Sequence, residues 1–235
     1  MTKSRGVADW GHYPPVNNNI LINPSFTVFQ RAGTTDSGDW GVDHNEDSYG
    51  PDRWRVRGIN GVGGTMSQSS TAIDPTTGIN KLVVKHRNAT KTSYTYQRIE
   101  TVNLLGLYGK EMTFSFSYSD VGGSGVPKVL INTFNSIGTA EELFNAVPKS
   151  LGNNRWVCTV TLTTLDGTFP DPSERGMQVL IYPNERNVAP NEWSVWEPKL
   201  EVGTVPTPFI ARSYGEELAL CQRYYLNAGL QNGFV

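Results

Sequence analysis

The chain has 235 residues and a formal net charge of −2 at pH 7, with 20 Lys and Arg residues scattered along it. No apolar run approaches the ~20 residues that a membrane helix needs, and there is no basic cluster, so we expect neither membrane insertion nor nucleic-acid binding. The 24 Gly and 14 Pro residues, beside 37% hydrophobic residues, favour many short strands joined by tight turns.

Residues 1–19 are expected to form an extended N-terminal arm. Pro14 and Pro15 fix φ and lack backbone donors, and the three asparagines at 17–19 favour turns over strand ladders. The arm has no apolar stretch of the kind that a signal peptide needs, which predicts synthesis in a cytoplasm followed by retention there or release by lysis. Trp10 and Tyr13 are interpreted as candidate contacts to a partner protein.

The next stretch has two short apolar runs interrupted by Pro24, which is typical of an edge strand or a bend.

A polar loop over residues 32–52 follows. A solvated loop is the favoured interpretation of this segment. A structural Ca²⁺ site is the second, because carboxylate oxygens suit Ca²⁺, although the D-x-D-x-D-G spacing is absent. Glycoside hydrolysis comes last, since nothing in an exposed loop would raise the pKa of one carboxyl group. The acidic residues of the loop are Asp36, Asp39, Asp43, Glu46, Asp47 and Asp52.

Alternation with period two marks the predicted strands. In residues 111–119 the large apolar side chains share one face, and Thr113, Ser115 and Ser117 share the other. Residues 155–165 repeat this pattern, so we expect each strand to place its apolar face on a core and its polar face in water. Residues 53–57 also alternate, with Trp54 and Val56 on one face and three arginines on the other. Weaker strand patterns cover residues 81–86, 93–99, 126–134, 177–182 and 193–200.

About nine or ten strands separated by Gly, Pro and Asn turns predict an all-β protein, a two-sheet antiparallel sandwich of jelly-roll type over residues 20–212. The remaining residues, 213–235, are predicted to form a short C-terminal helix and a tail. Ser213 and Glu216 have the spacing of a capping box, and apolar residues recur at helical spacing over residues 214–225. Cys158 and Cys221 are too few for a disulfide framework and are expected to be buried.

Two stretches near the ends of this region are distinctive. NNNILINPSFTVFQRAG, followed by PDRWRV, contains Asn19, Leu21, Ile22, Asn23, Phe26, Gln30, Arg31, Asp52, Arg53 and Trp54. WEPKLEVGTVPTPFIARSYGEELALCQRYY contains Leu200, Glu201, Gly203, Thr207, Pro208, Phe209, Arg212 and residues 216–225. They resemble the opening and closing signatures of a family of bacteriophage tail-fibre and related virion surface proteins, and LALCQRYY is the most specific part. Departures from the pattern are Pro24, Ser25, Phe29 and Pro198, where we expect local turn geometry to differ.

The resemblance implies a virion structural protein, a tail-fibre or adsorption-apparatus component with a sandwich like that of carbohydrate-binding modules. It further implies a place on the tail or capsid exterior, contacts with other virion proteins or host-surface polysaccharide, and a homo-oligomer, most simply a trimer. The alternative is a capsid decoration, head-fibre or adaptor protein without glycan binding. From the residues themselves, Trp54, Phe209 and the helix face around Cys221 are expected to pack in the interior, so that the signatures mark how the sandwich closes.

Catalytic motifs are missing from the sequence. The patterns H-E-x-x-H, G-x-S-x-G and C-x-x-C are absent, and the three histidines lie far apart, so we expect neither an enzyme nor a cofactor. Glycan binding needs flat aromatic faces beside carboxylates or amides. Each candidate for such a contact is, as a single residue, more often a simple case of partial burial. The candidate glycan contacts are Trp40, Tyr49, Tyr94 and Tyr182.

Overall fold

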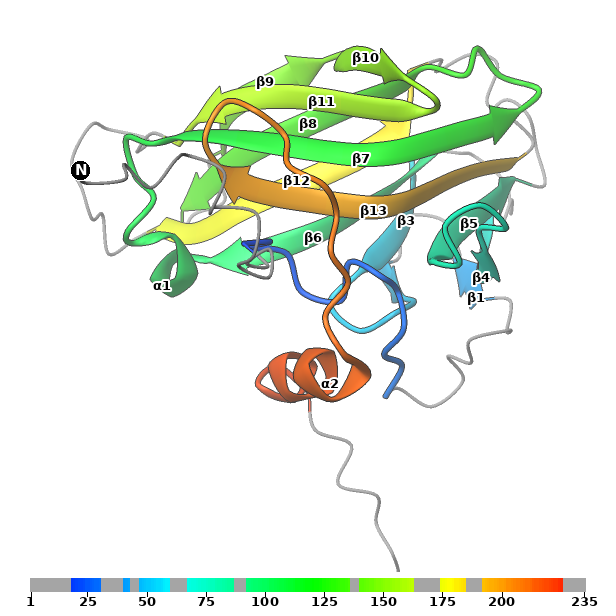
Figure 1. Cartoon of the computed structure of the whole chain (residues 1–235), viewed down its shortest axis with the longest axis horizontal. Helices are drawn as coiled ribbons and strands as arrows, with labels where there is room; N and C mark the ends of the chain where they lie inside the picture. Colours follow the sequence, from blue (N-terminus) through cyan, green and yellow to red (C-terminus); the bar gives the residue numbers. More distant parts are fainter. Residues whose placement is uncertain are drawn as a thin grey trace, which may run out of the picture.

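A computed structural model describes residues 18–30, 40–42, 47–59, 67–86, 92–135, 140–162, 174–184 and 192–225. These residues form two antiparallel sheets packed face to face (Figure 1). The seven-stranded sheet has the order β1 (Trp40–Val42), β4 (Ser67–Ile73), β5 (Asn80–His86), β13 (Glu192–Val202), β7 (Glu111–Val121), β11 (Arg155–Thr161), β10 (Lys149–Gly152). The six-stranded sheet has the order β2 (Asp47–Tyr49), β3 (Arg55–Ile59), β6 (Thr92–Glu100), β12 (Glu174–Pro183), β8 (Pro127–Asn135), β9 (Ala140–Ala146).

The core lies between the two sheets. From β5 to β8 the chain alternates between one sheet and the other, as in a jelly roll. The apolar face predicted for residues 111–119 is confirmed, because Phe114, Phe116 and Tyr118 of β7 are all fully buried. Trp54 and Val56 are buried as well, and both cysteines are free and buried, as expected. The predicted all-β sandwich is therefore the observed fold.

The polar face of β7 does not lie in water, contrary to the prediction. Thr113 and Ser115 are 0% exposed. Residues 203–212 form a strap that crosses the outside of the seven-stranded sheet on its way to the C-terminal helix (Figure 1). Thr113 donates to the carbonyl of Gly203 at 2.6 Å, and Arg155 donates to the hydroxyl of Ser115 at 2.8 Å. The strap and these side chains supply the hydrogen bonds that water was expected to supply.

Several local predictions were wrong. Residues 18–30 contain turns and no strand, so the edge-strand alternative fails and the bend is correct. Thirteen strands are present among the described residues, where nine or ten were expected. Strand β9 comes from a segment that was expected to be a short helical turn or a loop, and β4 from a polar segment that was not predicted as a strand. Phe209 is only half-buried and lies outside the core that was expected to receive it.

Two helices occur in the described residues. The first, α1 (Thr101–Leu104), is a single turn whose Leu104 is buried in the core. The second, α2 (Tyr214–Gln222), begins at the predicted capping box of Ser213 and Glu216, and its Cys221 packs against Ile22 and Val28. Among the described helices, neither is long and apolar enough to cross a membrane.

Candidate functional site

The six-stranded sheet has an inner face on the core and an outer face that points away from it. It lies behind the seven-stranded sheet in Figure 1, so its outer face is turned from the viewer. Core residues such as Ile99, Val129 and Val179 fix the inner face, and side chains between them along each strand point outward. We define the tyrosine face as the outward residues Arg55, Arg57, Tyr94, Tyr96, Arg98, Lys128, Asn132, Gln178, Leu180 and Tyr182.

Two tyrosines of β6 form the centre of the tyrosine face. The rings of Tyr94 and Tyr96 are 5.7 Å apart and tilted by 45°. Arg55 donates to the hydroxyl of Tyr96 at 3.3 Å, and the Arg98 guanidinium lies 5.6 Å from the centre of the same ring. Tyr96 is only 2% exposed, whereas Tyr94 is half-buried. Tyr94 is therefore the more accessible of the two rings.

The second half of the tyrosine face lies on β12 and β8. Tyr182 is 5% exposed, with the ammonium group of Lys128 6.0 Å from its ring centre. Arg98 donates to the side-chain oxygen of Gln178 at 2.9 Å and so joins β6 to β12. The amide oxygen of Asn132 is buried and accepts no hydrogen bond from the described part of the chain. Aromatic rings, amides and cations thus share one surface.

The structure brings together two of the four predicted glycan contacts. Tyr94 and Tyr182 both belong to the tyrosine face. Tyr49 lies on β2 of the same sheet, where its backbone pairs with that of Arg55, and its side chain is outside the described residues. Trp40 lies on β1 of the other sheet, so the four residues do not share one face. Trp10 and Tyr13 lie outside the described residues.

Sequence reasoning missed most of the tyrosine face. Tyr96 was not proposed, although period-two alternation over residues 93–99 places it beside Tyr94 on the same side of the strand. The arginines of β3 were assigned to one outer face, but nothing in the sequence showed that β3 pairs with β6. That pairing sets Arg55 opposite Tyr96 and Arg57 opposite Tyr94.

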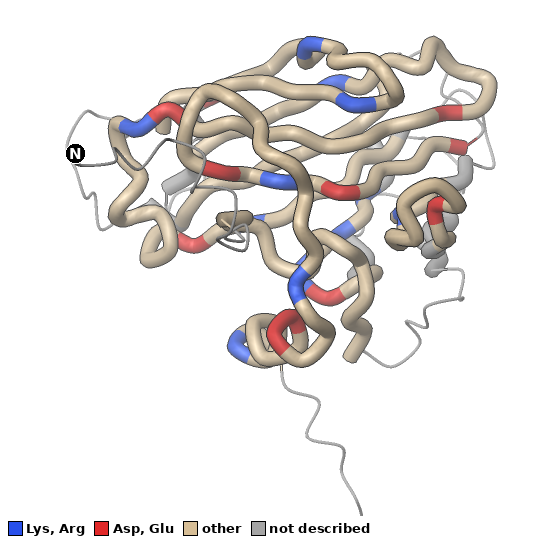
Figure 2. Tube along the Cα trace, viewed as in Figure 1, with Lys and Arg blue, Asp and Glu red and all other residues tan. Residues whose placement is uncertain are grey.

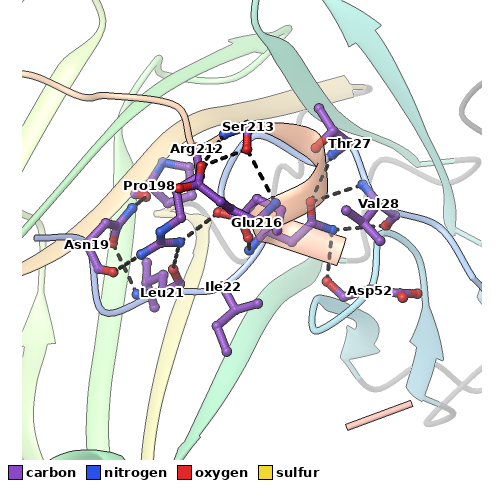
Figure 3. Close-up of polar contacts among 12 residues, drawn as sticks. Asn19, Leu21, Ile22, Thr27, Val28, Asp52, Pro198, Arg212, Ser213 and Glu216 are labelled. Atoms are coloured by element: carbon purple, nitrogen blue, oxygen red, sulfur yellow. Dashed lines mark hydrogen bonds and ion pairs between the residues drawn. The ribbon is translucent and has the colours of Figure 1, made fainter. Parts of the chain in front are cut away.

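A second polar cluster joins the two ends of the described chain, and we call it the terminal clasp: residues 18–30, 52–54, 198–201 and 212–225 (Figure 3). Asn19, 5% exposed, is one of its centres. Its side-chain amide donates to the carbonyl of Pro198 at 3.0 Å, and its side-chain oxygen accepts from the backbone of Leu200 at 3.0 Å. Arg212 donates to the carbonyl of Asn19 and, at 3.0 Å, to that of Leu21.

Glu217 and Asn23 form the other centre of the terminal clasp. Glu217 is 0% exposed and pairs with Arg212 at 2.7 Å, and its second oxygen accepts from the backbone of Asn23 at 2.6 Å. The amide of Asn23 donates to the carbonyls of Val28 and Asp52, both at 3.0 Å. The expectation that the signatures mark how the sandwich closes is therefore confirmed for these residues, which hold α2 and the opening segment on the sheets.

Asp52 also has a place in the terminal clasp. It is 2% exposed and accepts hydrogen bonds from the backbone of Gln30 at 3.0 Å and from its side chain at 2.5 Å. The rest of the acidic loop lies largely outside the described residues. Within the described ranges, no three His, Cys, Asp or Glu side chains gather in a way that could hold a metal ion.

The described structure also has cavities, one at the terminal clasp and one at the edge of the sandwich. The first, of about 270 Å³, is lined largely by residues of the terminal clasp, including Arg53 and Tyr224, together with Asn103 of α1. The other, of about 480 Å³, lies at the edge of the sandwich near β9, β10 and β11. Cys158 lines the second cavity, but burial raises the pKa of its thiol to about 12, so it holds no reactive thiolate at neutral pH.

Comparisons with known proteins concern the fold. No family model matches the sequence, and no curated protein sequence matches it significantly. The enzymatically active domain of tailspike protein 4 of bacteriophage CBA120 is 8% identical, with a TM-score of 0.43 over 64% of this chain and 19% of that chain. The C-terminal family 22 carbohydrate-binding module of Clostridium thermocellum Xyn10B is 13% identical, with a TM-score of 0.47 over 82% of this chain and 100% of that module. TmCBM61, solved with β-1,4-galactotriose, is 11% identical, with a TM-score of 0.41 over 79% of this chain and 99% of that chain. This chain thus spans about a fifth of the tailspike chain.

Proposed function

We propose that this chain is a structural protein of a bacteriophage particle, a component of the tail fibre or adsorption apparatus, and that its sandwich binds host-surface polysaccharide through the tyrosine face. The virion role is supported by the two signatures. Their residues meet in the terminal clasp, which gives the two motifs a common physical purpose, closure of the sandwich. The role is binding without catalysis.

The composition of the tyrosine face carries the glycan part of the proposal. Sugar rings expose C–H groups that pack on aromatic faces, and their hydroxyls need donors and acceptors beside those faces. Tyr94 offers a half-buried ring, and the side chain of Asn132 on the same face is partly exposed. Gln178 and Lys128 add polar groups on neighbouring strands of the same face.

The proposal includes the assembly of the chain. A closed cyclic arrangement, most simply a homotrimer, matches a projection on a symmetric particle. We place it on the exterior of the virion, in contact with other virion proteins. If the tyrosine face binds no glycan, the chain is instead a capsid decoration, head-fibre or adaptor protein, and the same face contacts protein.

A glycan array probed with the full chain tests the binding role. We expect the wild type to bind host-surface polysaccharide and Tyr94→Ala to bind about tenfold more weakly, since the variant loses one aromatic contact. Tyr214→Ala is the matched control, because Tyr214 is 58% exposed on α2, away from the tyrosine face. Binding that is equal in all three proteins, or absent in all, would refute a glycan site at this face. The position of the chain's density in an intact particle tests the virion role separately.

A further inference from the structure

The charges of the tyrosine face are not balanced. Arg55 and Arg57 on β3, Arg98 on β6 and Lys128 on β8 give it four cations. The carboxylates among the described outward side chains between β3 and β9 are Glu142 on β9, paired in register with Asn132, and Glu100 at the end of β6, which lies 3.8 Å from Arg53. The opposite sheet differs, since acidic and basic positions alternate along its β13 (Figure 2). Even counting Asp47, whose backbone pairs with Arg57, cations exceed carboxylates on the tyrosine face of a chain with a net charge of −2.

The cations stand on both sides of the aromatic centre. Residues two apart on a strand are about 6.8 Å apart, which is the expected spacing of Arg55 and Arg57 along β3. Strands β6 and β12 separate β3 from β8, so Lys128 stands three strand spacings, about 14 Å, from the arginine row. Arg57 is paired in register with Tyr94 and Lys128 with Tyr182, so a ligand lying over Tyr94 meets positive charge at both of its edges.

We propose that the tyrosine face binds an anionic polysaccharide, with carboxylate or phosphate groups of the polymer held by Arg57 and Lys128 on opposite sides of Tyr94. This inference rests on the proposed glycan-binding function and narrows its ligand class. A guanidinium has five N–H donors, so an arginine that already bonds within the protein can also bind a ligand anion. Its planar fork matches the geometry of both carboxylate and phosphate.

Polymers that differ only in charge provide the test. The full chain is titrated with polygalacturonate and with the same polymer fully methyl-esterified, which keeps the sugar backbone and removes the charge. A poly(ribitol phosphate) is titrated in parallel, and distinguishes a phosphate ligand from a carboxylate ligand. We expect at least tenfold tighter binding to one of the charged polymers than to the ester, and a weakening of that binding as NaCl rises, because surface charges are screened by salt.

The paired variant Arg57→Gln/Lys128→Gln locates the effect. It should lose about tenfold in affinity for the charged polymer, the change expected when a charge-assisted contact is lost, and it should bind the ester as the wild type does. Lys149→Gln removes one cation from the exposed strand β10 of the other sheet and should change nothing. Equal binding of charged and esterified polymers, weakened by Tyr94→Ala, would overturn the anionic ligand and leave the proposed function standing. No binding to any polymer would overturn both.

Discussion

Glu201 and Lys199 form an ion pair beneath the strap, with 3.1 Å between the ammonium nitrogen and a carboxylate oxygen and side chains only 1% and 2% exposed. Thr207 donates to Glu201 twice, from its backbone at 2.8 Å and from its hydroxyl at 2.6 Å. Burial alone would raise the pKa of Glu201. The hydrogen bonds from Thr207, Asn18 and Lys199 outweigh burial and hold the pKa below its usual value.

The direction of this pKa shift predicts how stability depends on pH. Because the folded pKa lies below the ~4.3 of an unfolded glutamate, the ionised carboxylate stabilises the fold fully above that value and loses its contribution as pH falls through the folded pKa. Glu201→Gln should cost about 3 kcal/mol at pH 7, since Lys199 is left buried without its counter-charge. In urea titrations the difference from wild type should shrink as pH falls below about 4. A stability difference that is constant from pH 7 to pH 3 would contradict this account. The control is Glu111→Gln, at the exposed start of β7.

The sequence pattern did not predict the backbone conformation of several single residues. Asn23, Phe26 and Arg53 all have left-handed backbones, with φ of 53°, 51° and 73°. Asparagine adopts that region readily, but phenylalanine and arginine rarely do. Arg53 was predicted to share an outer face with Arg55 and Arg57. Its left-handed backbone instead turns its guanidinium over the ring of Tyr224, 3.5 Å from the ring centre, so strand alternation begins only after it.

Strands were predictable where one face is apolar and continuous. Residues 111–119 and 155–165 correspond to β7 and β11, because their alternation is strict over at least seven residues. Strand β9, with the sequence AEELFNA, has residues that favour helix, and it becomes a strand through pairing with β8. Strand β4, SQSSTAI, has almost no apolar residues and pairs with β5. Such tertiary pairing cannot be predicted from local composition.

The core face of β7 gives a prediction at the scale of the element. Phe116 is 0% exposed, and its ring stacks on that of Phe114 with 5.1 Å between ring centres. Phe116→Ala should lower the free energy of unfolding by about 3–5 kcal/mol, through lost burial and the cavity that remains. Phe209→Ala removes the same atoms from a half-buried site outside the core and should cost only about 1 kcal/mol. Equal losses for the two variants in denaturant titrations would show that the strap contributes as much as the core.

At the scale of the molecule, the terminal clasp joins segments that are far apart in the sequence. Asn19 and Leu200 are 181 residues apart in sequence and are joined by a hydrogen bond. The resemblance to one family paired the two signatures, but only the fold shows that they touch. The arm joins the described chain at Asn18, whose amide donates to Glu201 at 2.8 Å. Among the described residues, the contacts that fix the opening segment on the sheets begin at Asn18.

The last prediction concerns the arm itself, and it follows from the proposed homotrimer. Residues 1–16 contain Trp10, Tyr13 and two prolines among mostly polar residues, too little apolar surface to form a core alone. Aromatic residues of this kind concentrate binding energy at protein contacts, so we expect the arm to dock on a neighbouring subunit or another virion protein. Deleting residues 1–16 keeps the Asn18 and Asn19 contacts, so the melting temperature measured at low protein concentration should change little. Light scattering should report a trimer for the full chain and a smaller species for the truncated one, and the truncated chain should be missing from purified particles. A truncated chain that still forms trimers and enters particles normally would remove the arm from the assembly, and helix α2, whose Tyr214 is 58% exposed, would become the better candidate for the contact.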